Sequence, residues 1–79
     1  MYYANRANAY LELKHYHKCI DDCNMAINIE PKYSKAYYRK AKALQGCMRI
    51  ADAIEALEKG AKVEPGNESI SQLLETLKS

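Results

Sequence analysis

The strongest constraint on the fold of this chain is an internal repeat. Pro31 and Pro65 lie 34 residues apart, and a glutamate precedes each of them. The same offset of 34 positions aligns apolar residues along the chain: Tyr3 with Tyr37, Ala7 with Ala41, Ala9 with Ala43, Tyr10 with Leu44, Ile20 with Ile54, and Ile29 with Val63. Because small and large apolar positions recur together, the chain contains two copies of one structural unit.

Within each unit, the apolar residues have helical spacing. In the first unit, one stripe contains Tyr3, Ala7 and Tyr10. The short junction "LKHY" separates it from a second stripe formed by Tyr16, Ile20, Cys23 and Ile27. The glycine and proline content is low, at three and two residues, which favours helix almost throughout. The pattern predicts helices over residues 2–13, 16–29, 35–46, 50–63 and 68–78.

The helix starts carry their own signals. Ser34 follows "PKY" and is expected to cap the third helix, and Asn67 follows Gly66 and is expected to cap the fifth. That fifth helix has a single apolar face at i, i+3, i+4 and i+7, formed by Ile70, Leu73, Leu74 and Leu77. The predicted fold is therefore an all-α solenoid of two helix-turn-helix repeats, at 1–33 and 34–67, with a C-terminal capping helix at 68–79.

This pattern resembles the tetratricopeptide repeat family, whose unit is a 34-residue helix-turn-helix with small residues at the helix crossing and a proline after the second helix. Tyr3 and Tyr37 stand at the positions where the family usually has tryptophan. Ala7 and Ala41 stand where the family usually has glycine at the helix crossing. The resemblance implies a superhelical stack in which the first helices of successive repeats line a concave surface.

In such a stack, residues 34 positions apart become neighbours on adjacent first helices. Asn5 and Arg39 are related in this way, and Lys35 lies one turn before Arg39 on the same face. Asn8 and Lys42, again 34 positions apart, extend the polar stripe. An amide, an ammonium and a guanidinium would thus converge on one patch, and this combination suits a carboxylate.

The segments "YYANRANAYLELKHYHKCIDDCNMAI" and "YSKAYYRKAKAL" are similar to the second and third repeats of the carboxylate-clamp subgroup. These co-chaperones bind the extreme C-terminus, ending Glu-Glu-Val-Asp, of cytosolic heat-shock chaperones of the seventy- and ninety-kilodalton classes. The resemblance makes Asn5 in "NRA", Lys35 in "SKAY" and Arg39 in "YRKA" the carboxylate-binding residues. The subgroup's other clamp lysine and asparagine belong to a preceding repeat.

Two alternatives to a clamp stay open. A charged stripe on a helix is often only a solvated face. A tetratricopeptide scaffold could also bind a partner helix or assemble with itself, without carboxylate specificity. A preceding repeat would have packed partly against Tyr2, Tyr3 and Tyr10, so we expect self-association through the first helix, or exchange of helices between chains.

Other functions are disfavoured. A net charge of +2 argues against nucleic-acid binding, and the chain lacks the ~18 consecutive apolar residues of a membrane span. No secretory segment follows Met1 and the cysteine count is odd, which predicts a cytoplasmic protein.

Metal binding and catalysis are disfavoured for positional reasons. His15, Cys19 and Cys23 have a spacing that could place three zinc ligands on one helical face. However, the two cysteines occupy packing positions equivalent to Ala53 and Leu57, so we expect neither a metal nor a cofactor. The acidic pairs are no better candidates for catalysis, because Asp21, Asp22 and Glu55 fall on second helices, whose outer face is expected to be solvated. We expect no enzyme.

Overall fold

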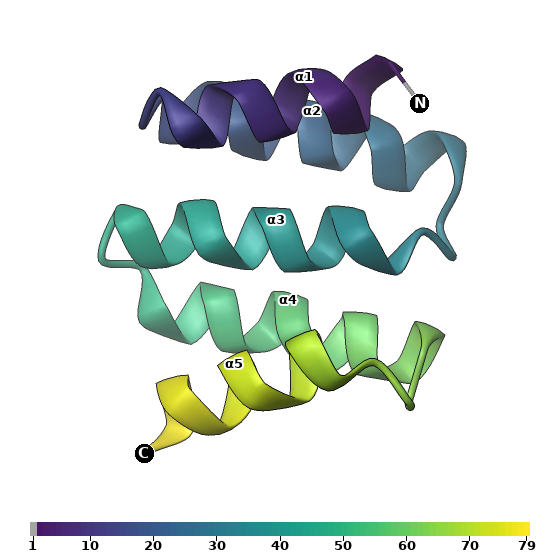
Figure 1. Ribbon diagram of the computed structural model, residues 1–79, viewed down its shortest axis with the longest axis vertical. Coiled ribbons are helices and arrows are strands. Elements are labelled where there is room, and N and C mark those ends of the chain that lie inside the picture. The colour runs from purple at the N-terminus through teal and green to yellow at the C-terminus, as the bar shows by residue number, and fades with distance from the viewer. Residues whose placement is uncertain (1) are drawn as a thin grey trace.

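The computed structural model describes the backbone of residues 2–79 and the side chains of residues 5–79. Within these limits the chain forms five helices: α1 Tyr2–Glu12, α2 Tyr16–Ile29, α3 Ser34–Gly46, α4 Ile50–Val63 and α5 Glu68–Lys78. Each helix packs on the next one along the chain, and α1 also contacts α3 (Figure 1). The predicted all-α solenoid with a closing helix is confirmed. None of the described helices has the length and apolar character needed to cross a bilayer.

The helix ends differ from the prediction by one residue at two places. Helix α1 ends at Glu12, and α3 begins at Ser34 because Tyr33, not Ser34, is its N-cap. The predicted cap of α5 is confirmed, since the Asn67 side chain accepts a hydrogen bond of 3.0 Å from the backbone amide of Ile70.

The two repeats turn between their helices in the same way. Lys14 and Met48, 34 positions apart, have φ angles of 62° and 64°, in the left-handed region. The backbone amide of the following residue donates to the carbonyl of Tyr10 in the first repeat and of Leu44 in the second, at 2.8 Å in both. This combination is the Schellman motif, which satisfies carbonyls left over at a helix end. It appears here without glycine.

Small residues pack where the helices cross. One cluster contains Ala7, Cys19, Cys23 and Ala43, all of them fully buried. The other is built around Ala41, Ala53 and Leu57, and Ile70 of α5 closes it, with Leu73, Leu74 and Leu77 packed against it. Cys19 and Cys23 therefore occupy packing positions as predicted, and α5 covers the end of the second repeat.

A partly buried ion pair joins the two helices of the first repeat, with the Asp22 side chain 5% exposed and the Arg6 side chain 41% exposed. The guanidinium of Arg6 donates from Nε to Oδ2 of Asp22 at 2.7 Å and from Nη2 to Oδ1 at 2.6 Å. The prediction that Asp22 lies on a solvated outer face is wrong, because this residue is only 3% exposed. Asp22 lies three residues after Cys19, so it shares the face of α2 that packs on α1. Its role is structural.

A second polar cluster ties together three helix ends. The carboxylate of Glu64, just after α4, accepts hydrogen bonds from the hydroxyl of Ser34 at the start of α3 and from the amide of Asn67 at the start of α5. These two bonds, with a smaller contribution from the charge of Lys35, lower the pKa of Glu64 below its ordinary value of 4.5. Glu64 thus holds α5 against α3.

The contact between α4, α3 and α5 predicts the effect of one substitution. A methyl group at Gly60 would lie 2.9 Å from Cβ of Tyr37 and 3.0 Å from Cδ1 of Ile70. The Tyr37 Cβ is fixed by the α3 backbone, so Gly60→Ala should lower the free energy of unfolding by about 1–2 kcal/mol, even after the better helix propensity of alanine. The control Gly66→Ala, with no neighbour within 4 Å, should change it by less than about 0.5 kcal/mol. Urea denaturation measures both, and a more stable Gly60→Ala variant would contradict this packing.

The Glu64 cluster predicts a pH dependence. Because folding lowers the pKa of Glu64, its contribution to stability is fully present above pH 4.5 and is lost as the pH falls through the lowered value. Glu64→Gln should therefore be less stable than the parent at pH 7, and the difference should shrink as the pH falls below 4.5. Denaturation midpoints between pH 7 and pH 3 test this, with Glu12→Gln at the exposed end of α1 as control. A difference that is independent of pH would show that the ionised carboxylate is not what matters.

Candidate functional site

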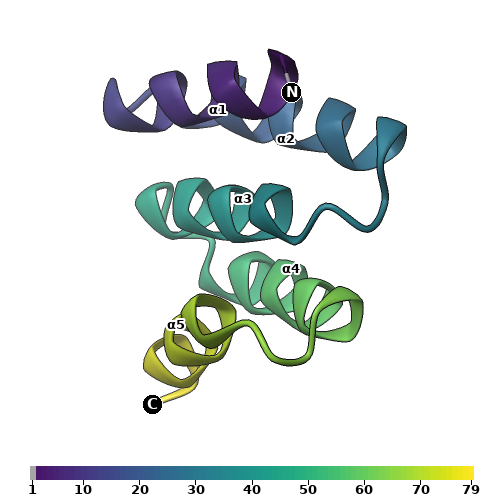
Figure 2. The ribbon, with the colours of Figure 1, turned by 45° about the vertical axis from the view of Figure 1, so that its right-hand side comes forward.

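A groove of about 330 Å³ opens between α1, α3 and the start of α5. Figure 2 shows α1, α3 and α5 along one side of the stack, with α2 and α4 on the other. Half of the lining comes from α3 and the remainder from α1 and α5; the residues are Asn8, Leu11, Lys35, Tyr38, Arg39, Lys42, Asn67 and Ser69. The groove is therefore the surface on which the predicted polar stripe was expected.

Most of the predicted site residues meet in this groove. Lys35, Arg39 and Lys42 follow each other at spacings of four and three along α3, and Asn8 faces them from α1. Asn5 is different, because its side chain is exposed and does not line the groove. It lies one turn before Asn8 on α1. The structure thus brings together two of the three predicted carboxylate-binding residues and both predicted additional contacts.

The groove carries positive charge. Of the groove residues whose side chains the structure describes, three are cationic and none is acidic. The positive charge of Lys35 contributes to the lowered pKa of Glu64, so this carboxylate lies near the Lys35 end of the groove. Glu64 accepts hydrogen bonds from Ser34 and Asn67, so its charge offsets part of the positive charge at the Lys35 end of the stripe.

The two buried thiols lie directly under α3. The Sγ atom of Cys19 lies 4.0 Å from the backbone carbonyl oxygen of Arg39, to which it donates a weak hydrogen bond. Cys19 and Cys23 are both free thiols, and the hydrogen bond between them lowers the pKa of Cys19 and raises the pKa of Cys23. His15 is exposed. In the part of the chain that the structure describes, no three His, Cys, Asp or Glu side chains are grouped so as to hold a metal ion. The Cys19 thiol therefore packs against the α3 backbone at Arg39, and both cysteines belong to the buried cluster that contains Ala43 of the same helix.

Four groove residues were missed by reasoning from the sequence. Leu11 lies three residues after Asn8 and Tyr38 three after Lys35, so the same-face rule for helices could have found both. Asn67 and Ser69 gave no such signal. Their position depends on the angle at which α5 folds back, which is decided by packing.

Comparison with known proteins identifies the repeated helix pair. The sequence pattern of the tetratricopeptide repeat matches residues 2–33 and 34–67. The Hsp70/Hsp90 co-chaperone CNS1 of Saccharomyces cerevisiae is 41% identical over 76 residues, which is 95% of this chain. The chain spans only 20% of the length of that relative.

Two solved structures are also similar. The second TPR domain of human RPAP3, in complex with the HSP70 peptide SGPTIEEVD, has a TM-score of 0.92 and 34% identity, over 98% of this chain and 64% of that one. The first TPR of Spaghetti (RPAP3), bound to the HSP90 peptide SRMEEVD, has a TM-score of 0.90 and 30% identity, over 96% and 60%. With two repeats matched in sequence and the same helical stack in space, the chain belongs to the tetratricopeptide repeat family.

Proposed function

We propose that the groove between α1, α3 and α5 binds an acidic peptide by its C-terminal carboxylate, and that this peptide is the tail of an Hsp70 or Hsp90 chaperone. The observation that carries the proposal is that Lys35, Arg39 and Lys42 line one groove, with no acid among its described lining residues. The similar TPR domains of RPAP3 are bound to peptides that both end in Glu-Glu-Val-Asp, which supports this choice of ligand.

Each groove residue has a separate part in this proposal. Arg39 can hold a carboxylate through two parallel hydrogen bonds, and Lys35 adds a point charge one turn away. Asn8 and Lys42 extend the contact along the peptide. Asn5, exposed one turn before Asn8, would donate to a peptide that continues past the end of the groove.

The apolar part of the groove suits the same peptide. Leu11 and Tyr38 lie among the cations, and the valine before the terminal aspartate offers an aliphatic side chain for them to contact. We therefore assign specificity for the valine to these two residues, and affinity for the carboxylate to the cations.

The same proposal covers the wider role of the chain. It acts as a co-chaperone adaptor rather than as an enzyme, without a cofactor, a metal ion, a nucleic acid or a membrane as its ligand. The repeats at 1–33 and 34–67 form its binding unit and 68–79 its cap. A cytoplasmic location stays a prediction from the sequence.

Calorimetric titration with SGPTIEEVD tests the groove. Lys35→Ala and Arg39→Ala should each weaken binding by about 1.5–3 kcal/mol, the range for hydrogen bonds to charged groups, or at least about tenfold in Kd. Lys62→Ala removes an exposed cation of α4 outside the groove and should leave Kd unchanged. The C-terminally amidated peptide should bind the parent chain about as weakly as the free-acid peptide binds the Lys35→Ala or Arg39→Ala variant. Equal affinity for the acid and the amide would reject the carboxylate clamp in favour of a general scaffold.

A second proposal, self-association, has its own observation. Ala9 and Ala43 occupy the same repeat position, yet Ala9 is exposed whereas Ala43 is fully buried among Ala7, Cys19 and Cys23. Helix α2 packs on the face of α3 that carries Ala43, whereas no described helix packs on Ala9 at the same position of α1. Tyr10 is half-buried, and the side chains of Tyr2 and Tyr3 lie outside the described residues.

We expect the chain to dimerise through α1, or to exchange helices, because this contact repeats one already present between α2 and α3. Light scattering across a concentration series should show a mass that rises with concentration, and Ala9→Lys should abolish the rise. Ala51→Lys, at an exposed alanine of α4, is the matched control. A monomeric parent at every concentration would remove the dimer and leave the groove proposal intact.

A further inference from the structure

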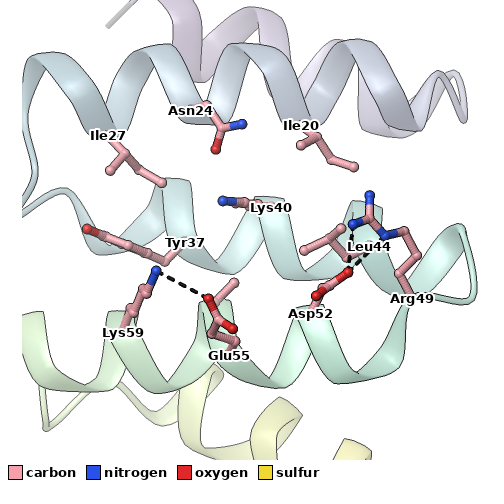
Figure 3. A pocket seen from close by; sticks show the side chains of 11 residues that line it. Ile20, Asn24, Ile27, Tyr37, Lys40, Leu44, Arg49, Asp52, Glu55 and Lys59 are labelled. Atoms are coloured by element: carbon pink, nitrogen blue, oxygen red, sulfur yellow. Dashed lines mark hydrogen bonds and ion pairs between the residues drawn. The ribbon is translucent and has the colours of Figure 1, made fainter.

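A second groove, of about 380 Å³, lies between α2 and α4 (Figure 3). It shares no lining residue with the first groove. Ile20, Asn24 and Ile27 of α2 form one wall, and α4 forms the other. From α3, the side chain of Lys40 lies between them, with Asn24 facing it across the groove.

The charges of this groove do not cancel. Arg49 pairs with Asp52 at 2.7 Å, and Lys59 pairs with Glu55 at 3.3 Å. The fifth charged lining residue is Lys40. Among the residues whose side chains are described, no hydrogen bond or ion pair joins Lys40 to another group. The groove therefore carries one uncompensated positive charge beside two aliphatic side chains.

The repeat explains why this lysine lacks a partner. Lys40 lies 34 positions after Arg6, and the residue 34 positions after Asp22 is Ala56. The first repeat thus has a cation on its first helix held by a carboxylate on its second, through two hydrogen bonds. The second repeat keeps the cation and has alanine in place of the acid. Ala56 is 4% exposed and lines the groove.

We propose that this groove binds a segment of a partner protein that presents an Asp or Glu side chain between two aliphatic residues. The partner's carboxylate takes, beside Lys40, the part that Asp22 plays beside Arg6. The Asn24 amide oxygen points toward Lys40 in Figure 3, and a turn of this amide about its last side-chain torsion lets its nitrogen donate to the same carboxylate. Ile20 and Ile27 contact the aliphatic neighbours. This inference does not depend on the function of the first groove, because the two surfaces use different residues.

A blocked peptide separates the two grooves. We would titrate the ¹⁵N-labelled chain with acetyl-Ile-Gly-Glu-Gly-Ile-amide, which has no terminal carboxylate, and with the same peptide carrying Gln in place of Glu. The Glu peptide should shift the backbone amides of Asn24, Lys40 and Ala56 and should bind at least about tenfold more tightly than the Gln peptide. Equal binding of the two peptides, or shifts confined to the first groove, would overturn the inference.

Two variants test the role of Lys40. Lys40→Met keeps the aliphatic stem and should remove the preference for Glu over Gln, whereas Lys62→Met, at an exposed lysine of α4, should retain it. Ala56→Asp restores the acid of the first repeat, so it should occupy Lys40 and weaken the Glu peptide by at least about tenfold. Circular dichroism establishes that each variant is folded. Should Ala56→Asp fail to fold, Lys40→Met decides the question, and an unchanged preference in that variant would reject the proposal.

Discussion

The close packing of helices at small buried residues is the constraint on which the rest of this structure depends. Ala7, Cys19, Ala41 and Ala53 have no exposed surface, and only short side chains allow the helix backbones to approach each other this closely. A helix pair cannot cover its own apolar face, so each pair must stack on the next. The stacking in turn places α1 beside α3 and creates the groove between them.

Helix α3 serves both surfaces because it lies in the middle of the stack. Arg39 and Lys40 are consecutive residues, and consecutive residues of a helix point in directions about 100° apart. Arg39 therefore lines the groove between α1 and α5, while Lys40 lines the groove between α2 and α4. One helix presents cations to two sides, and the apolar residues between them, such as Ala41 and Leu44, hold it in the core.

The two repeats share a backbone and differ in their charges. The Arg6–Asp22 pair is only partly buried, since the Arg6 side chain is 41% exposed. Solvent screens such a pair, so it contributes little net stability. The fold can therefore keep Arg6 with Asp22 in one repeat and place Ala56 opposite Lys40 in the other. The lysine stays half-buried and within reach of water, which avoids the cost of an isolated buried charge.

The sequence by itself determined the helices, the repeat and the packing positions of Cys19 and Cys23, because a period of 34 residues and helical spacing of apolar side chains follow directly from the order of residues. It also placed Lys35, Arg39 and Lys42 on one stripe. Tertiary structure alone decided which side chains complete the groove. Asn5 lies outside its lining, and Asn67 and Ser69 belong to it, because the angle of α5 is set by the burial of Ile70 and by the hydrogen bonds of Glu64. Tertiary structure also decided that Asp22 is buried rather than solvated, since only the crossing of α1 and α2 shows which face of a helix has a partner.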